Sequence, residues 1–484
     1  MTLKIKLKII SFFVASLTVC YACSKDKPGN TNTIFERIKF EAEYAEFTGS
    51  AKIDRSISGY SGKGYVTDFN NSTNKLIFNV MNDSLGVYDI YLQYTTSTWG
   101  ETSCNIKINN SNAFECNLNA TGESFKEIKI TSTNLLLNKN IVTITPIHTN
   151  FAIDYIRITP YTLGPVSNEL VTPDPSPEAV ALYNYLKSVY GKKIHSGATA
   201  ITGSLDEENW IYQQTGKYPA LAGFDFMNHT RGYSWENKDD LVKNAKYWWS
   251  QNGMVVAHWH WRDPSRATDA FYSLATSYSE RTSFDASKIN DTLSLEYAAM
   301  IQDMDTIAAY LKQLRDAHVP VLWRPFHEAS GKWFWWGYKG ADVTKKLWQV
   351  MFNRFVNYHG LNNLIWIWTS DTKSDDITWY PGDDMVDIIG MDIYPPNGDF
   401  SSQVANFNQV NKDFSGNKLV TLSECGSIPD PDNLVNDHAG WLWFMPWYGN
   451  YTRSDAINPV SQWQKIMNHN YVITLDEMPD LKIQ

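Results

Sequence analysis

The feature that most constrains the fold is a regular alternation of short apolar segments and helical patterns between residue 193 and the C-terminus. Eight segments are apolar enough to be strands buried on both faces: 193–196, 220–225, 254–258, 319–326, 363–369, 386–391, 418–423 and 441–445. Such strands, separated by helices, indicate a parallel sheet. Eight repeats predict a (β/α)8 TIM barrel. A doubly wound sheet is the alternative, but the glycine-rich first turn of a nucleotide site is missing.

The barrel is expected to span residues 177–484 and to begin with a helix. Ser176 can cap this helix, Pro177 suits its first position, and Gly191 ends it. Prolines between residues 165 and 177 indicate an extended linker over 161–176.

Residues 35–160 show a different pattern, with short alternating segments at 75–79, 86–94, 105–109, 140–145 and 153–158. Turn-forming residues separate these segments. Regular short strands with such breaks predict a β-sandwich of the jelly-roll type. The glycine-rich stretch 59–64 lies in this region and is no phosphate-binding loop.

The N-terminus reads as an export signal. Lysines at positions 4, 6 and 8 precede an apolar run over 9–20, which is too short to cross a bilayer. Ala22 followed by Cys23 resembles a bacterial lipoprotein signal, and the charged residues 24–27 resemble the signals that send Bacteroidetes lipoproteins to the cell surface. We therefore expect a lipoprotein signal peptide over 1–22, lipidation of Cys23, a flexible tether over 23–34, and attachment to the outer membrane at the cell surface. A periplasmic or secreted protein is the alternative.

Composition excludes one class of partner and favours another. The formal net charge is −10 and there are no basic runs, so nucleic acid is an unsuitable ligand. The 19 tryptophans suit stacking against sugars, with core packing as the plain alternative. Cys104 and Cys116 lie on neighbouring strand-like segments and can pair in an oxidising compartment, whereas Cys425 is expected to be a buried free thiol.

Two glutamates follow apolar strands of the predicted barrel, Glu328 after strand four and Glu424 after strand seven. Active residues of such barrels stand at the C-terminal ends of strands, and strands four and seven face each other across the barrel mouth. A protonated and an ionised carboxyl group flanking one bond suit glycoside hydrolysis. The aromatic run 333–336 is expected to keep Glu328 protonated, and Arg324 and Tyr394 are the expected donors to Glu424. Either glutamate alone could instead be a salt-bridge partner or helix cap.

Other candidates are weaker. His258 and His260 share one strand face and form a potential metal pair, although sugar contact or packing fits them better. Asp225 and Asp392 also end strands and are expected to make structural hydrogen bonds. Trp366 and Trp368 are expected in the core.

The strand-four motif, residues 324–337, resembles the acid/base signature of glycoside hydrolase family 26, and residues 422–426 resemble its nucleophile segment. The resemblance covers about residues 180–484 and implies a retaining endo-β-1,4-mannanase with Glu328 as acid/base and Glu424 as nucleophile, without a catalytic cofactor. By the same resemblance, His327 and Trp333 line the site, Tyr394 bonds Glu424, and His258 and Trp447 contact the sugar next to the cleaved bond. Together with Arg324, these are the expected substrate-binding residues. This chain departs from the family at Ala329 and Ser330, where Met-Asn or similar is typical.

The N-terminal region resembles carbohydrate-binding module family 35 or its relative family 6, through residues 40–45 and 153–156. In those modules the matching acids hold a structural Ca²⁺, which implies Glu41, Glu43 and Asp154 as ligands. Ordinary edge-strand acids are the alternative.

The sequence thus predicts a monomeric enzyme that cuts internal linkages of β-mannan, glucomannan or galactomannan. Two alternatives stay open. The first is another β-glycanase of the same family, acting on β-1,3-xylan or mixed-linkage glucan. The second is a non-catalytic surface glycan-binding protein that keeps the barrel as a lectin.

Overall fold

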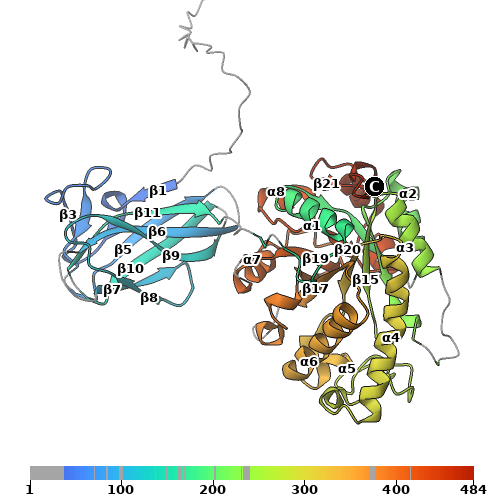
Figure 1. Cartoon of the computed structure of the whole chain (residues 1–484). Helices are drawn as coiled ribbons and strands as arrows, with labels where there is room; N and C mark the ends of the chain where they lie inside the picture. The colour runs from blue at the N-terminus through green and yellow to red at the C-terminus, as the bar shows by residue number, and fades with distance from the viewer. Residues whose placement is uncertain are drawn as a thin grey trace, which may run out of the picture. The chain divides into compact units, whose positions relative to one another are not determined.

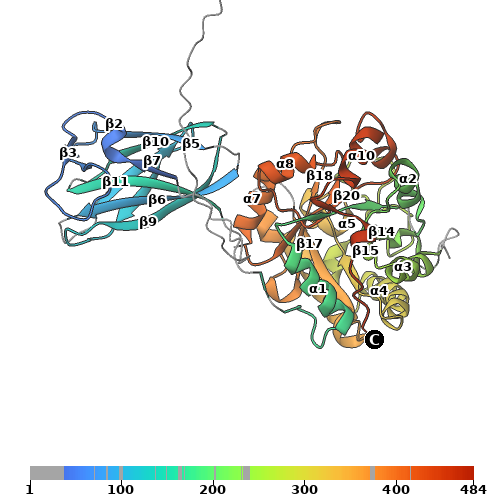
Figure 2. The ribbon, with the colours of Figure 1, turned by 90° about the horizontal axis from the view of Figure 1, so that it is seen from above.

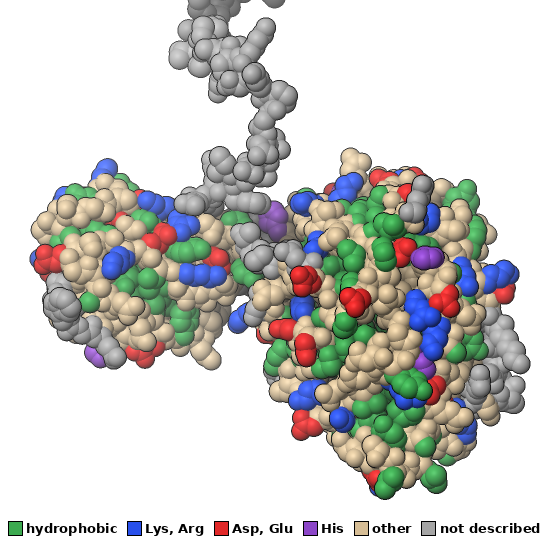
Figure 3. Space-filling model, in the orientation of Figure 1, with side chains coloured by type: hydrophobic (Ala, Val, Ile, Leu, Met, Phe, Trp, Pro, Cys, Tyr) green, Lys and Arg blue, Asp and Glu red, His purple; other side chains and the backbone are tan. Residues whose placement is uncertain are grey.

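The computed structural model describes residues 38–483 except 70, 83–85, 97–101, 137, 149, 162–165, 168, 201–202, 231, 233–239, 371–375 and 415. The predicted signal peptide, the lipidation site Cys23 and the tether lie outside the described residues. No helix in the described part has the length and apolar character needed to cross a bilayer. On the face shown in Figure 3, the charged side chains of both signs are interspersed.

The first folded region is a sandwich of two antiparallel sheets (Figure 1). One sheet has the order β3-β4-β11-β6-β9, with β1 also paired to β11, and the other has the order β2-β5-β10-β7-β8. The strands are β1 (Ile38–Glu41), β2 (Glu46–Phe47), β3 (Lys52–Asp54), β4 (Tyr65–Thr67), β5 (Leu76–Asn82), β6 (Gly86–Thr96), β7 (Thr102–Ile108), β8 (Phe114–Leu118), β9 (Lys126–Leu135), β10 (Asn138–Pro146) and β11 (Phe151–Pro160).

Alternating side chains of these strands form the sandwich core. In β5, for example, Leu76, Phe78 and Val80 are buried while the residues between them are at least partly exposed. Cys104 on β7 lies directly opposite Cys116 on β8, and both are buried free thiols. The predicted sandwich is confirmed, although six strands (β1, β2, β3, β4, β8 and β9) lie outside the predicted segments.

The second region is a parallel eight-stranded sheet in the sequential order β13 to β20. The strands are β13 (Gly197–Thr199), β14 (Leu221–Asp225), β15 (Met254–His258), β16 (Val321–Arg324), β17 (Leu364–Ser370), β18 (Ile388–Ile393), β19 (Leu419–Cys425) and β20 (Phe444–Pro446). β13 also lies against β20, since a Cβ on Gly197 would stand 2.9 Å from the carbonyl oxygen of Phe444. The sheet is therefore closed, and the predicted barrel is confirmed.

Helices cover the outside of the barrel (Figure 2). They are α1 (Pro177–Val189), α2 (Asp206–Thr215), α3 (Leu241–Ser250), α4 (Leu295–Arg315), α5 (Trp335–Tyr338), α6 (Ala341–Phe352), α7 (Val404–Asp413), α8 (Pro431–Asn436), α9 (Asn450–Arg453) and α10 (Val460–Met467). α1 begins as the sequence predicts, with the Ser176 hydroxyl accepting the Ala179 amide at 3.2 Å. Trp366 and Trp368 are buried on β17, as expected for core residues.

The prediction for the first barrel strand was wrong. Residues 194–195 form β12, which pairs with β21 (Val472–Ile473) in a separate two-stranded sheet. The barrel strand is the next segment, β13, whose residues are Gly, Ala and Thr. Such small side chains carry little of the apolar signal that marked the other strands, so the pattern was assigned to the more apolar neighbour.

The end of the predicted linker is bonded to the barrel. The Val171 amide donates to Asp387 at 2.8 Å, and the Ser176 amide donates to the Asn362 carbonyl at 2.8 Å. Asp387 also accepts the Trp366 amide of β17 at 2.7 Å, so one buried carboxyl ties this segment to the sheet.

Candidate active site

The strand register brings polar side chains together at the C-terminal end of the barrel. Asp225, the last residue of β14, is paired in register with His258, the last residue of β15, and His258 is paired with Arg324, the last residue of β16. In a parallel barrel these strand ends share one rim. Three functional side chains from segments about 30 to 65 residues apart thus stand in one row.

A second row comes from β18 and β19. Asp392 is paired with Glu424 across these strands, just after an irregularity in the register beyond Met391. Both oxygens of the Glu424 carboxylate accept hydrogen bonds. Oε1 accepts from the Tyr394 hydroxyl, and Oε2 accepts from Nη2 of Arg324. Hydrogen bonds to the charged form favour an ionised carboxylate. These are the two donors that the sequence predicted for Glu424.

Arg324 links the two rows. Its guanidinium is fully buried and also donates from Nη1 to Asp392 Oδ2 at 2.8 Å and to Thr369 Oγ1 at 3.2 Å. Burial opposes its charge, but the carboxylates of Asp392 and Glu424 outweigh that effect and raise the pKa of Arg324. The arginine is therefore a permanent cation held between two acids.

Glu328 does not lie on a strand. β16 ends at Arg324, and the chain then turns through Phe326 and Glu328, which both have left-handed backbones with φ of 51° and 53°. Such conformations are costly for residues other than glycine and cluster at functional sites. The turn directs the Glu328 carboxyl toward Trp333, whose indole Nε1 donates to Oε2 at 2.8 Å.

The environment of Glu328 favours the protonated acid. Burial raises the pKa of this carboxyl well above its usual range, and the nearby charges of Asp392 and Glu424 raise it further. Asp392 itself has a pKa raised to about 7, mainly by burial. Glu328, with its raised pKa, thus shares one site with Glu424, which accepts two hydrogen bonds.

The distance between the acids is short. One carboxylate oxygen from each of Glu328, Asp392 and Glu424 lies within 4.8 Å of the others. In retaining glycosidases, which form a covalent glycosyl-enzyme, the two carboxyl groups are about 5–5.5 Å apart. In inverting glycosidases, where water attacks the sugar directly, they are roughly 6.5–9.5 Å apart. The geometry therefore favours a covalent intermediate on one carboxylate. The guanidinium of Arg324 bonds two of the three acids, which makes the cluster unsuited to a metal ion.

Three buried histidines form a chain of contacts beside the acids. His260 Nδ1 lies 2.7 Å from Asp225 Oδ2, and His260 Nε2 lies 3.1 Å from His327 Nε2. Burial lowers the pKa of His258 to about 3 and that of His327 well below its ordinary value, so both rings are neutral at pH 7.

The same contacts bear on whether His258 and His260 form a metal site. The ligand atoms of Asp225, His258 and His260 lie within 4.8 Å of one another. Although burial favours the neutral acid, His260 and His258 lower the pKa of Asp225 to about 2, so it is an acceptor. Its 2.7 Å contact is therefore a hydrogen bond donated by His260 Nδ1, and the other ring nitrogen, Nε2, lies 3.1 Å from His327 Nε2. The arrangement suits hydrogen bonding better than metal binding.

Trp447 stands over this group. Its ring centroid is 5.4 Å from those of His258 and His260, and its amide donates to the Cys425 carbonyl at 3.1 Å, next to Glu424. The indole is partly exposed, so one part of the ring is available to a ligand.

The four residues of the predicted aromatic wall act differently. Trp333 donates to Glu328, which by itself lowers the pKa of the carboxyl, while burial raises it. Trp335 donates to the Trp261 carbonyl at 2.6 Å, and Trp336 donates to the His327 carbonyl at 3.0 Å, and both rings are buried. They support the turn from behind.

A stacked tyrosine pair completes the site and was missed from the sequence. The rings of Tyr272 and Tyr278 stack at 4.1 Å, and Tyr278 is 55% exposed. Ser273 fixes this loop, since its amide and hydroxyl donate to the carbonyls of Trp333 and Lys332, each at 2.6 Å. The platform therefore lies beside the acid Glu328. Its only sequence signal was the run of aromatic residues after β15.

The predicted metal ligands of the sandwich converge on one loop. Ser61 donates from its hydroxyl to Glu41 at 2.6 Å and from its amide to Asp154 at 2.9 Å, and Lys63 donates from its amide to Glu43 at 2.5 Å. Glu43 Oε2 is buried without a hydrogen-bond partner among the described residues.

Comparisons with known proteins agree on both regions. The model of glycosyl hydrolase family 26 matches residues 171–477, and that of carbohydrate binding module family 35 matches residues 38–161. The chain is 35% identical to a mannan endo-1,4-beta-mannosidase of Thermothelomyces thermophilus over 454 residues, which covers 91% of this chain and 90% of that protein.

Two solved structures extend this likeness. A GH26-CBM35 β-(1,4)-mannanase of Podospora anserina has a TM-score of 0.61 at 34% identity, covering 92% of this chain and 99% of that one. A β-mannanase from a symbiotic protist of the termite Reticulitermes speratus, complexed with gluco-manno-oligosaccharide, has a TM-score of 0.62 at 47% identity, covering 65% of this chain and 98% of that one.

Proposed function

Because this chain belongs to glycosyl hydrolase family 26, we propose that it is a retaining endo-β-1,4-mannanase that hydrolyses internal linkages of mannan, glucomannan or galactomannan. The observation that carries the mechanism is the short separation of Glu328 and Glu424, within 4.8 Å between oxygens. Similarity to mannanases over nine-tenths of the chain supports the substrate class.

In the first step, Glu328 gives its proton to the glycosidic oxygen while Glu424 attacks the anomeric carbon. The bond to the leaving sugar breaks, and a glycosyl ester with Glu424 forms. Glu328, now ionised, then takes a proton from a water molecule that attacks the same carbon, and the ester is released. Both acids return to their starting states, and no cofactor is needed.

The surrounding residues would support this sequence. Arg324 and Tyr394 bond Glu424 and fix its orientation. The partly exposed Trp447 would contact the sugar on one side of the cleaved bond, whereas His258 and His327 are buried and would support the site from behind. Trp333 and the Tyr272–Tyr278 platform lie beside Glu328 and would hold the leaving part of the chain, because aromatic faces stack on the apolar faces of sugars.

Product analysis over time on mannan, glucomannan and galactomannan tests the function. Long oligosaccharides early in the reaction are expected, because internal cutting produces them. Release of products only from β-1,3-xylan or mixed-linkage glucan would assign another family activity. Glycan binding without any product would indicate a lectin.

Two variants test the roles of the acids. Glu424→Ala should lose turnover and retain oligosaccharide binding. Glu328→Ala should keep its first step on aryl mannosides with good leaving groups, which need no proton. Full activity of Glu424→Ala on mannan would remove its assigned role.

We also propose that Glu41, Glu43 and Asp154 hold a structural Ca²⁺ in the sandwich. Three hard oxygen ligands suit this ion, and the partnerless buried oxygen of Glu43 favours a cation there. Gly62 leaves the room that this needs, since a Cβ at this position would stand 2.2 Å from Glu43 Oε1.

Finally, we propose that the protein is a monomeric lipoprotein of the outer membrane, anchored at the cell surface through Cys23. The sequence around this cysteine supports the proposal. In cells of the source organism, Cys23→Ser should move the protein from the membrane fraction to the soluble one. An unchanged membrane fraction would contradict lipidation at this residue.

A further inference from the structure

A pocket of about 520 Å³ lies outside the active site, between α2 and Arg453 at the end of α9. Its walls combine the aromatic rings of Trp210, Tyr212 and Tyr218 with polar side chains, among them Asp206 and Gln213. This mixture of flat rings and hydrogen-bonding groups in a concave surface is a general feature of ligand sites.

The aromatic part is a supported platform. Tyr212 is 45% exposed and stacks on Tyr218, with ring centroids 4.2 Å apart and planes 11° apart. Tyr218 is itself held from behind by the edge of Trp248 at 5.9 Å and donates its hydroxyl to Asn209 Oδ1 at 3.3 Å. The exposed tyrosine is therefore fixed in place, and a fixed ring loses little conformational entropy when it binds a ligand.

The polar part of the pocket offers both hydrogen-bond donors and hydrogen-bond acceptors. Arg453 donates from Nε to Glu207 at 2.8 Å, and neither Nη1 nor Nη2 has an acceptor in the described part of the chain. Asp206 and Gln213 lie seven residues apart on α2 and therefore share one face of the helix. A carboxylate, an amide and a guanidinium can each bond two neighbouring hydroxyls, which are the groups that a sugar presents around its ring.

The pocket is connected to the active site through one loop. Glu207 is buried and accepts the Gly449 amide at 3.0 Å as well as Arg453, so it fixes the loop that begins with Trp447. Arg453 follows Trp447 by six positions, a span of at most roughly 20 Å. A glycan chain leaving the active site on this side would thus pass near the pocket.

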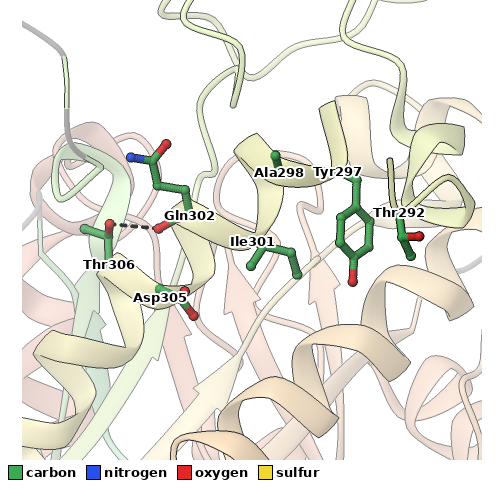
Figure 4. Close-up of a pocket in the computed structure, with 7 residues that line it drawn as sticks. All are labelled: Thr292, Tyr297, Ala298, Ile301, Gln302, Asp305 and Thr306. Carbon is green, nitrogen blue, oxygen red and sulfur yellow. Dashed lines mark hydrogen bonds between the residues drawn. The ribbon is translucent and has the colours of Figure 1, made fainter. Parts of the chain in front are cut away.

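Two other pockets of the described residues lack this combination. One of about 560 Å³ lies along α4, and the residues drawn in Figure 4 include a single aromatic ring, that of Tyr297. Another of about 320 Å³ lies between α1 and residues 169–175 and contains one tyrosine, Tyr183, which is buried.

From these observations we propose that the pocket around Tyr212 is a second binding site for β-mannan on the catalytic domain, separate from the cleavage site. This rests on the proposed function, because the sugar chemistry is taken from the substrate. Tyr212 stacks on one sugar ring, while Arg453, Asp206 and Gln213 bond its hydroxyls. The site holds the polymer on the barrel during repeated cleavage.

Kinetics of full-chain variants test the site. Tyr212→Ala should raise the KM for polymeric mannan about two- to tenfold, the loss expected for one aromatic stack. The matched control is Tyr358→Ala, because Tyr358 is 69% exposed on another face and contacts Arg354 rather than the pocket. Its KM should equal that of the wild type. Equal KM values for both variants would contradict the proposal.

Crystals of the full-chain Glu424→Ala variant soaked with mannohexaose give a direct test that does not depend on activity. Electron density for sugar is expected against the Tyr212 ring. If sugar density appears at Tyr212 but the wild type releases no product from mannan, the proposed function is overturned and the binding site stands. Product release by the wild type, with no density at Tyr212, would overturn the site and keep the function.

Discussion

At the scale of single residues, two glutamates of the site differ in their hydrogen-bond partners and in the charges around them. Glu424 accepts two charged or polar donors, Arg324 and Tyr394, whereas Glu328 accepts one indole N–H and faces two other acids. The same functional group is thus suited to the proposed role of nucleophile at one position and of acid at the other.

Tyr394→Phe tests the orientation of the nucleophile. Loss of a hydrogen bond to a charged group costs about 1.5–3 kcal/mol, so kcat on mannan should fall about 10- to 100-fold. The proposed roles of Glu328 and Trp447 do not depend on this hydroxyl, so KM should change less than kcat. Steady-state kinetics on a defined manno-oligosaccharide measure both values. A kcat within twofold of the wild type would show that Arg324 alone is sufficient.

Asp392→Asn tests the proposed role of Glu328 as the acid. Glu328 must be protonated to act, so its raised pKa extends activity to higher pH. Removing the negative charge of Asp392 lowers that pKa, and the alkaline limb of kcat/KM should move down by about one pH unit. The control is Asp303→Asn, which removes a buried carboxyl bonded to Arg266 and Trp261 instead. An alkaline limb that stays in place would argue against Glu328 as the titrating acid.

At the scale of elements, the turn after β16 depends on close packing with α5. A Cβ on Gly337 would stand 2.0 Å from the carbonyl oxygen of Ala329, the residue after Glu328. Only glycine lets this helix approach the turn, and the indoles of Trp335 and Trp336 then fill the space behind it.

Gly337→Ala should therefore displace the acid. Overpacking of this kind costs about 1–3 kcal/mol, so the unfolding temperature and kcat should both fall. The control is Gly216→Ala at the end of α2, where a Cβ meets nothing within 4 Å but φ is +78°. That variant should lose stability and keep kcat. Calorimetry and assays on a short substrate separate the two effects, and an unchanged kcat in Gly337→Ala would contradict the packing argument.

At the scale of the whole molecule, the proposed hydrolysis and the proposed calcium binding belong to different regions, the barrel and the sandwich. The acids of the catalytic site come from the barrel, while Glu41, Glu43 and Asp154 come from the sandwich. Ligand bound only by the folded state stabilises that state, by about 2.7 kcal/mol at 100 times its dissociation constant.

Removal of calcium should accordingly lower the unfolding temperature of the sandwich and leave the hydrolysis of a short manno-oligosaccharide unchanged. Calorimetry with a chelator, and again after added Ca²⁺, measures the first effect. Glu43→Gln should no longer respond to the ion. Identical unfolding curves in chelator and in Ca²⁺ would exclude the proposed ligand set.

Local sequence was sufficient for the fold class and for the two catalytic candidates. Apolar strands and capped helices are patterns of neighbouring residues, and strand ends of a parallel barrel must meet at one rim, so Glu328 and Glu424 could be expected there. Only the tertiary structure decided their surroundings. The proximity of Asp392 to Glu328, the contact of His260 with His327, and the Tyr272–Tyr278 platform depend on register, irregular turns and burial. These arise from packing between segments far apart in the chain, and no local pattern encodes them.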